Sequence, residues 1–514
     1  MAKQVITRDA KRHPVTLVYA AFIAGLCSII YELLIATTVS YFSGDSVKYF
    51  SLTIGIYMAS MGLGSYASKY IDEDILRKFI IAELMLGLLG GISIPALYFA
   101  YTFTGAFIPT YIIFTVSIGF LIGLEIPFLT RLMEEYNQLK FNIANILSFD
   151  YLGALIATIS FPFILLPFFG VYQSSLIFGL VNMSIGFVTL WMFNDRLKNK
   201  TKTLKTATIL LTTFIGGMIV FSGAALKKWD QALYDDRIIY SEQTRYQKIV
   251  MTKHKEDIRL FLDGNLQFSS IDEHRYHETL IHVPLSVHKR PVRRVLLLGA
   301  GDGLAVRELL KYPSIEEIIL VDLDETIIQL AKENHYLTAI NKRSLESPKV
   351  TVINADAFSY LSDNQKQFDF IVSDLPDPNN NTLARLYSTQ FYKLVRLNLS
   401  ENGMFVTQAT SPYFATDAFW SIVKTIEASS FDIVYPFHSQ IPSFGDWGFV
   451  MASSQEKEIT RPNVSAETKF LTHEIFSKLF VFEKDIRPQN VAVNMIDRPV
   501  LLRYYLKGWK HYSQ

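Results

Sequence analysis

Long apolar segments separated by short polar connectors make up the chain as far as about residue 226. Each segment is close to the ~20 residues that a helix needs to cross the hydrocarbon core of a bilayer. We count seven of them: 15–35, 50–67, 79–101, 108–128, 146–168, 174–193 and 207–225. Buried helices of a large soluble domain would need polar faces, which these segments lack. The sequence therefore predicts a multi-pass α-helical membrane domain over residues 1–226, located in the cell membrane.

Composition narrows the class of protein further. Half of the 514 residues are hydrophobic and 19% are charged, which is unusual for a soluble enzyme. The net charge of +1 gives no reason to expect nucleic acid as a partner. The one cysteine, Cys27, lies inside the first apolar segment, so we expect neither a disulfide framework nor a cysteine metal site.

The charged residues of the apolar half leave two questions open. Glu32, Glu83, Glu125 and Asp150 lie inside predicted spans, where ionisable groups are often functional unless they reach the interface from a span end. Lys and Arg cluster at the N-terminus and in alternate connectors, which the positive-inside rule places in the cytoplasm. With seven crossings, the C-terminal half would emerge on the opposite side. Either one segment does not span, or that half faces outward.

From about Asp230 the pattern changes to strands and helices. A β-rich stretch comes first, and Asp263-Gly264 reads as a hairpin turn within it. Strands then alternate with helices, which is typical of a mostly parallel, doubly wound sheet. The later strands are predicted at 294–298, 315–321, 350–354, 368–373 and 404–408. We therefore expect a small β subdomain over residues 230–275 and an α/β Rossmann-like, nucleoside-binding domain over residues 276–514.

A glycine turn, Gly-Ala-Gly-Asp-Gly at 299–303, follows the first strand of the Rossmann-like domain. A dinucleotide fingerprint needs glycines at its first, third and sixth places, but the sixth place here is Leu304. Gly299, Gly301 and Gly303 form a G-x-G-x-G pattern instead. That pattern favours a nucleoside of the S-adenosylmethionine type.

Carboxylates follow successive strands: Asp302, Asp322, Asp356, and then the pair Asp374 and Asp377. Open α/β sheets bind ligands at the carboxyl ends of their strands. A carboxylate at position 322 can accept hydrogen bonds from both ribose hydroxyls, and one at 356 can reach the adenine amino group. Each of these aspartates can also be a helix N-cap and nothing more. Carboxylates gathered at one edge suit a cationic substrate, whereas most nucleotide sites hold anionic phosphates.

Residues 246–408 resemble spermidine synthase, a polyamine aminopropyltransferase, in an ordered series of motifs. They are Tyr246-Gln247, Leu262-Asp263-Gly264, Gln267, Asp272-Glu273, Tyr276-His277-Glu278, the turn at 299–303, Asp356-Ala357, Asp374-x-x-Asp377-Pro378, Leu386-Tyr387 and Gln408. The apolar half has no counterpart in the soluble enzymes and resembles the membrane-anchored bacterial type. The resemblance implies transfer of the aminopropyl group of decarboxylated S-adenosylmethionine to an amine, such as putrescine giving spermidine, with release of methylthioadenosine.

The resemblance also implies partners. Decarboxylated S-adenosylmethionine would be a co-substrate, and we expect no cofactor and no metal. The partners would be small-molecule amines, this nucleoside and the lipid bilayer. Soluble relatives commonly self-associate, so a homo-oligomer is possible, and the sequence does not reveal its stoichiometry.

For the nucleoside, the resemblance implies roles for five residues. Gln247 and Asp322 would hold the nucleoside, with Asp356 and Ala357 around the adenine. Asp302 would meet the ammonium group of the aminopropyl arm.

For the amine, it implies roles for five more. Tyr276 and His277 would line the amine channel, and Gln408 would lie at its mouth. Asp374 would be the catalytic base and Asp377 its neighbour. The chemistry agrees, because an amine with a pKa near that of lysine (about 10.4) must lose a proton before it attacks.

Two departures from the family pattern leave the amine acceptor open. Asn379-Asn380-Asn381-Thr382 stands where a segment ending in Gly-Pro is usual. Phe444 stands where the soluble enzymes place a tyrosine hydroxyl at the amine site. Asp446 either compensates with its charge or belongs to a loop turn. The tail at 504–510 is aromatic and basic, consistent with a membrane-surface contact, ordinary packing or an oligomer interface.

Two other functions remain as alternatives. A methyltransferase could use the same nucleoside fold, although a carboxylate at Asp302 would repel the carboxylate of ordinary S-adenosylmethionine. A membrane carrier or sensor of polyamines, with a non-catalytic binding domain, would explain acids inside the spans.

Overall fold

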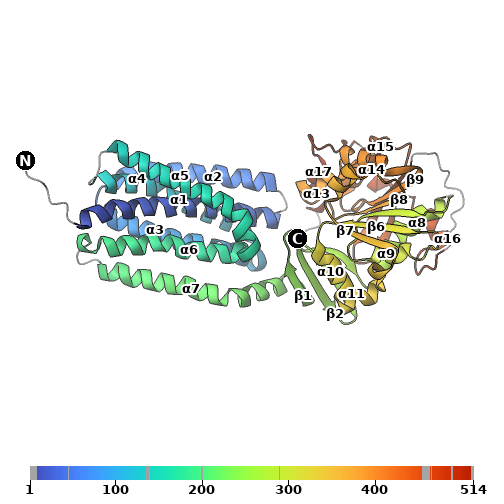
Figure 1. Ribbon diagram of the computed structural model, residues 1–514, viewed down its shortest axis with the longest axis horizontal. Helices are drawn as coiled ribbons and strands as arrows, with labels where there is room; N and C mark the ends of the chain where they lie inside the picture. The colour runs from blue at the N-terminus through green and yellow to red at the C-terminus, as the bar shows by residue number, and fades with distance from the viewer. Residues whose placement is uncertain are drawn as a thin grey trace, which may run out of the picture. The chain divides into compact units, whose positions relative to one another are not determined.

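The computed structural model describes residues 8–43, 46–134, 136, 139–197, 201–288, 290–453, 464, 466–487 and 490–510. The chain divides into two compact units, Met1–Asp235 and Asp236–Gln514 (Figure 1). Parts of the basic clusters, Lys3 and residues 198–200 among them, lie outside the described residues.

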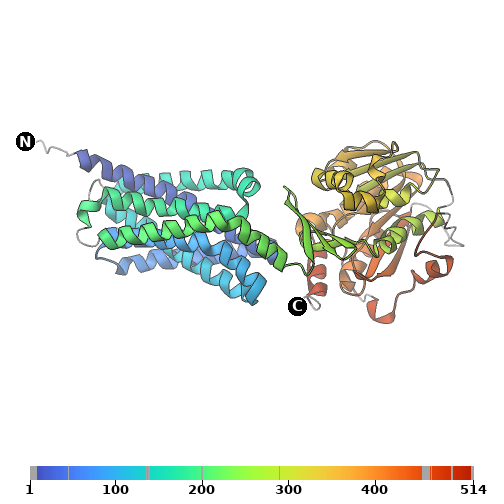
Figure 2. The ribbon, with the colours of Figure 1, turned by 90° about the horizontal axis from the view of Figure 1, so that it is seen from below.

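The described residues of the first unit form long helices that run side by side (Figures 1 and 2). They are α1 (Arg8–Ser43), α2 (Ser46–Ala67), α3 (Ile75–Phe99), α4 (Phe107–Glu134), α5 (Leu139–Ser160), α6 (Leu166–Met192) and α7 (Thr201–Ala232). Helix α3 packs on α6, α1 on α5, and α2 on α4. Gly90 permits one close approach, because a Cβ there would lie 2.3 Å from the ring of Tyr31.

Five helical stretches among the described residues are each long and apolar enough to cross a membrane. They are His13–Ser43, Ile75–Thr104, Phe107–Glu134, Asn142–Met192 and Thr201–Ala232. Asn142–Met192 includes the predicted segment 146–168 and all but the last residue of the segment 174–193, and Ser46–Ala67 is not among the five. The count of seven crossings therefore stays a prediction. Helix α7 continues to Ala232, beyond the predicted end at residue 225.

The second unit begins with a small antiparallel sheet in the order β1-β2-β3-β4. Its strands are β1 (Arg237–Gln243), β2 (Lys248–His254), β3 (Asp257–Leu262) and β4 (Asn265–Ser269). Asp263 and Gly264 form the turn between β3 and β4, as predicted, and both have positive φ (48° and 79°).

A seven-stranded sheet in the order β10-β11-β9-β8-β5-β6-β7 forms the centre of the unit. Its strands are β5 (Arg294–Gly299), β6 (Glu317–Asp322), β7 (Val350–Asn354), β8 (Phe368–Asp374), β9 (Leu399–Gln408), β10 (Ile433–Ile441) and β11 (Gly445–Ser453). Strands β5 to β9 are parallel, while β10 and β11 form an antiparallel hairpin at one edge. The chain runs outward from β5 through β6 to β7, then returns to place β8 on the other side of β5. The junction of β5 and β8 is therefore a switch point, where open α/β sheets bind ligands.

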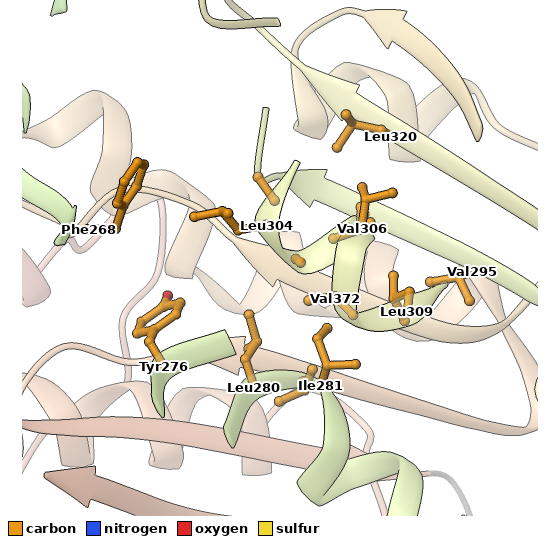
Figure 3. Close-up of a cluster of buried hydrophobic side chains, with 14 of the residues drawn as sticks. Phe268, Tyr276, Leu280, Ile281, Val295, Leu304, Val306, Leu309, Leu320 and Val372 are labelled. Carbon is orange, nitrogen blue, oxygen red and sulfur yellow. The ribbon is translucent and has the colours of Figure 1, made fainter. Parts of the chain in front are cut away.

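Helices cover both faces of this sheet, so the predicted doubly wound arrangement is confirmed. One face packs against α8 (Glu273–Val287), α9 (Leu304–Leu309), α10 (Glu325–Glu333) and α11 (His335–Asn341). The other packs against α12 (Ala357–Asp363), α14 (Thr389–Asn398), α15 (Thr416–Glu427) and α17 (Leu501–Trp509). Figure 3 shows part of the hydrophobic core on the first of these faces. Leu280 and Ile281 of α8 lie beside side chains of α9, and Tyr276 lies at the end of the α8 row.

Candidate active site

The site is built where β5 and β8 separate at their carboxyl ends. Gly299 of β5 pairs with Asp374 of β8. A Cβ on Gly299 would lie 2.2 Å from the carbonyl oxygen of Asp374, and its φ is +82°. Only glycine permits this close approach without strain. The turn that begins at Gly299 therefore starts against Asp374, and it carries Asp302 three residues later.

Asp374 lies half-buried at the end of β8. The Tyr276 hydroxyl, from α8, donates a hydrogen bond of 2.5 Å to its Oδ1. Burial raises the pKa of Asp374 to about 6, and the charge of Asp302 adds to the rise, while His277 and Tyr276 oppose it. The Asp374 side chain is therefore mostly ionised near neutral pH and can still accept a proton.

Asp302 is held by its own turn. Its Oδ1 accepts a hydrogen bond of 2.9 Å from the backbone N–H of Leu304. Burial raises the pKa of Asp302, while the charge of His277 lowers it.

Asp377 is surrounded by donors from distant segments. Gln408 Nε2 lies 3.2 Å from its Oδ1, and Thr410 Oγ1 lies 3.1 Å from its Oδ2. The Tyr505 hydroxyl of α17 also acts on this carboxyl group and lowers its pKa. Burial raises the pKa of Asp377 to about 6, and these three donors limit the rise.

Gln408 holds the 374–377 segment in place. Its Nε2 also donates to the carbonyl of Leu375 (2.7 Å) and to the Tyr387 hydroxyl (2.6 Å). Its Oε1 accepts from the backbone N–H of Thr410 (2.9 Å). We call Asp302, Asp374 and Asp377 the acidic cluster, because Asp302 acts on Asp374 and the charges of Asp374 and Asp377 both act on Tyr276.

His277 supplies a positive charge beside this cluster. Burial lowers its pKa, but the hydrogen bond and charge of Glu273, together with Asp302 and Asp374, outweigh burial and raise the pKa to about 9. Its Nδ1 lies 2.9 Å from Glu273 Oε2.

The predicted nucleoside residues lie at the ends of β6 and β7. Asp322 accepts hydrogen bonds from the backbone N–H groups of Gly301 and Asp324, both at 3.0 Å. Burial raises its pKa to about 6. Gln247 Nε2 donates to Asp324 Oδ2 (3.0 Å), so a side chain from the small sheet reaches the same edge.

Asp356 is the N-cap of α12, the alternative that the sequence left open for each aspartate. Its Oδ1 accepts from the backbone N–H of Ser359 (2.9 Å), and its Oδ2 pairs with Arg385 (2.6 Å). Ala357, the next residue, is buried. For Asp322 the cap lies elsewhere, because Asp324 caps α10.

The two departures from the family pattern have structural consequences. Phe444 packs its ring against Tyr276 (6.0 Å between ring centres) and Trp447 (5.1 Å). Asp446 contacts His438, Nδ1 to Oδ1 at 2.7 Å, and this contact engages its carboxylate. Asn380 caps the short helix α13 (Asn381–Ala384), accepting from the backbone N–H of Leu383 at 2.8 Å.

Sequence reasoning missed the donors Thr410 and Tyr505 and the arginine Arg307, which binds Glu273. Tyr505 belongs to the aromatic tail, for which packing was one of the open alternatives. No local pattern links it to Asp377, since the two are brought together only by the packing of α17. In the part of the chain that the structure describes, no group of three or more His, Cys, Asp or Glu side chains is arranged to hold a metal ion.

Comparison with known proteins identifies the family. The model of the spermine/spermidine synthase domain matches residues 273–463. A polyamine aminopropyltransferase of Leptospira interrogans is 40% identical over 491 residues, which cover 95% of this chain and 98% of that protein. One from Oceanobacillus iheyensis is 37% identical, over 99% of this chain and 100% of that protein. The chain belongs to the polyamine aminopropyltransferase family. Its relatives are transferases of the spermidine synthase type, as the resemblance implied.

Another relative, polyamine aminopropyltransferase 1 of Ralstonia nicotianae, is 38% identical over 98% of this chain and 97% of that protein. These matches extend through the apolar half. Among solved structures, spermidine synthase from Thermotoga maritima is 26% identical, covering 49% of this chain and 86% of that chain with a TM-score of 0.45. A spermidine synthase in complex with the transition-state analogue AdoDATO gives the same identity and TM-score.

Proposed function

We propose that the chain transfers the aminopropyl group of decarboxylated S-adenosylmethionine to an amine acceptor, with Asp374 as the base. The acidic cluster at the junction of β5 and β8 carries the proposal. Both partners are cations, the nucleoside through its sulfonium and ammonium groups and the acceptor through its ammonium groups. Three carboxylates at one sheet edge attract and orient such partners.

The chemistry needs a base and no acid. The acceptor ammonium gives a proton to Asp374, and the freed nitrogen attacks the carbon next to the sulfonium. The new C–N bond forms as the C–S bond breaks, and the sulfur leaves as the neutral thioether methylthioadenosine. We propose that Tyr276 orients Asp374, and that Asp302 and Asp377 hold the ammonium groups of the two substrates.

The nucleoside would lie along the ends of β5, β6 and β7. We propose that Asp322 accepts hydrogen bonds from the ribose, with Gln247 beside it, and that Asp356 and Ala357 border the adenine. The co-substrate contains its own leaving group, so we propose that the reaction uses neither a cofactor nor a metal.

A substrate panel tests this function. Purified full-length protein is incubated with decarboxylated S-adenosylmethionine and a series of diamines, and methylthioadenosine is quantified. We expect methylthioadenosine and an aminopropylated amine in equal amounts, and neither with ordinary S-adenosylmethionine. Phe444 has no hydroxyl to hydrogen-bond an amine, so the panel also decides whether putrescine is an acceptor. If methyl transfer occurs with ordinary S-adenosylmethionine and no aminopropyl transfer is seen, the proposal is wrong.

We also propose that the helical unit anchors the enzyme in the cell membrane as a multi-pass protein. Five described helical stretches are long and apolar enough to cross, and relatives share the apolar half. Extraction of membranes at alkaline pH should leave the protein in the lipid fraction. A protease-accessible tag at the C-terminus would report which side the catalytic unit faces.

One observation favours a second function, cation binding by the helical unit. Glu83 of α3 and Glu125 of α4 are buried (0% and 3% exposed), and their carboxyl groups act on each other. Asn182 of α6 donates to Glu83 Oε2 (2.9 Å). Among the described residues, no donor reaches Glu83 Oε1, Glu125 Oε1 or Asn182 Oδ1. Buried acceptors that lack donors suit a cation.

Labelled putrescine tests this second function in the full-length protein in detergent. We expect Glu125→Gln to remove one binding event per chain and to leave aminopropyl transfer unchanged. Glu32→Gln, at a half-buried position of α1, is the control. Equal binding by wild type and Glu125→Gln would contradict cation binding by the helical unit.

A further inference from the structure

Glu273 lies outside the acidic cluster and hydrogen-bonds to His277, whose charge acts on Asp302 and Asp374. It is the first residue of α8 and is 5% exposed. His277 follows one helical turn later and is 2% exposed. The same helix carries Tyr276, which bonds Asp374.

The contacts of His277 define which of its ring nitrogens carries a proton. Nδ1 lies 2.8 Å from the backbone carbonyl oxygen of Glu273 and 2.9 Å from Glu273 Oε2. Both partners accept hydrogen bonds, so Nδ1 must carry the hydrogen. A proton on Nε2 as well gives the imidazolium, which Glu273 stabilises by its negative charge.

Arg307 keeps Glu273 ionised. Its NH1 and NH2 groups lie 2.8 Å from Glu273 Oε1 and Oε2, a bidentate pair with both side chains nearly buried. Burial raises the pKa of Glu273, but His277 and then Arg307 outweigh it and lower the pKa to about 2. Arg307 belongs to α9, which follows the glycine turn, so the pair also ties α8 to the turn that carries Asp302.

The charged and titratable groups around His277 and Asp374 come from several elements. They are Glu273 and Tyr276 of α8, Asp302 of the glycine turn, Arg307 of α9, Asp377 after β8, and Tyr387. His277 is the positive group that acts directly on both Asp302 and Asp374. Two carboxylates close together in a buried site would otherwise favour protonation of one of them.

We propose that Glu273 is a positioning residue for aminopropyl transfer: it keeps the His277 imidazole doubly protonated, and that fixed positive charge keeps Asp374 ionised within the acidic cluster. This inference rests on the proposed function. The charge is needed because the base must be unprotonated when the acceptor ammonium arrives, in a site whose burial favours the neutral acid.

The pH profile of kcat separates this role from a structural one. In Glu273→Gln, the amide oxygen can still accept from His277 Nδ1 and from one N–H of Arg307, the amide nitrogen faces the other N–H, and the negative charge is gone. Burial then favours neutral His277, and the pKa of Asp374 rises. We expect the acidic limb of the profile to move upward by about one pH unit, the low end for loss of a nearby charge. At pH values below the acidic limbs of both enzymes, kcat of Glu273→Gln should be about tenfold lower than kcat of the wild type. At alkaline pH the two values should be equal again.

Three further variants complete the test. Glu273→Asp keeps the charge and should keep the wild-type limb. His277→Asn removes the imidazolium itself and should shift the limb as Glu273→Gln does, which preserves the test if Glu273→Gln fails to fold. Glu308→Gln is the matched control, because Glu308 accepts from the same arginine (Nε to Oε1, 2.9 Å) but bonds His282 instead of His277. It should leave the limb in place.

The outcomes distinguish this inference from the function on which it rests. A wild-type enzyme with no aminopropyl transfer at any pH contradicts the proposed function. If the wild type is active and Glu273→Gln and His277→Asn both have its acidic limb, the proposed role of Glu273 is wrong. The proposed function is then not affected. A uniform loss of rate at every pH in Glu273→Gln would assign it a structural role.

Discussion

At the scale of single residues, burying the carboxylates of the acidic cluster lowers the stability of the folded protein at neutral and alkaline pH. The pKa of Asp374 is raised by burial from an ordinary value near 3.8 to about 6. A carboxyl group whose pKa is higher in the folded than in the unfolded protein stabilises the fold at pH values below its pKa in the unfolded protein. That stability is lost as pH rises through the folded pKa.

Asp374→Asn should therefore be more stable than wild type above pH 7. We expect a gain of about 1–3 kcal/mol at pH 8 and almost none near pH 4, because the shift of about two units applies only when the carboxylate is ionised. Thermal unfolding of both proteins across this range measures it. A constant difference at all pH values would contradict the proposed burial of charge.

Gly299 offers a second test at this scale. Gly299→Ala would drive a methyl group against the Asp374 carbonyl, and we expect a loss of about 2 kcal/mol or more in stability. Gly264 has a similar φ but nothing within 4 Å of an added Cβ. Gly264→Ala should cost only about 1 kcal/mol from its backbone conformation. Equal losses in the two variants would show that contact with Asp374 does not matter.

At the scale of elements, helix α17 completes the amine side of the site. Tyr505→Phe removes one donor to the Asp377 carboxylate, so its pKa should rise and its hold on an ammonium group should weaken. We expect KM for the amine to rise about tenfold with a smaller change in kcat.

Tyr504→Phe is the matched control for this helix. The Tyr504 hydroxyl accepts from the backbone N–H of Ala492 at 3.3 Å. Its loss should leave KM unchanged. Steady-state kinetics on the full-length variants measure these KM values. Equal KM values for Tyr505→Phe and wild type would show that α17 does not contribute to amine binding.

The elements that sequence predicts best are those with strong local patterns. The apolar run at 368–373 and the glycine turn predict β8 and its neighbour β5, and so the edge where Asp302 and Asp374 meet. The hairpin of β10 and β11 was not predicted, because its place beside β9 depends on long-range pairing. The approach of Tyr505 to Asp377 likewise arises from tertiary packing, which leaves no periodic signal in the sequence.

At the scale of the whole molecule, each unit has hydrophobic clusters of its own. A chain cut to residues 236–514 should therefore fold and keep kcat within a few-fold of the full-length enzyme. Circular dichroism and methylthioadenosine formation measure the two properties. An unfolded or inactive fragment would show that the catalytic unit depends on the helical one.

A single-turnover measurement of wild type and Asp374→Asn, with decarboxylated S-adenosylmethionine and a diamine that is turned over, shows whether Asp374 is the base. The wild type should release methylthioadenosine and aminopropylated amine in equal amounts. Asp374→Asn should be slower by about 10²–10⁴-fold while remaining folded, and Glu346→Gln, at an exposed ion pair, should match wild type. Unchanged turnover in Asp374→Asn would contradict the assignment of the base.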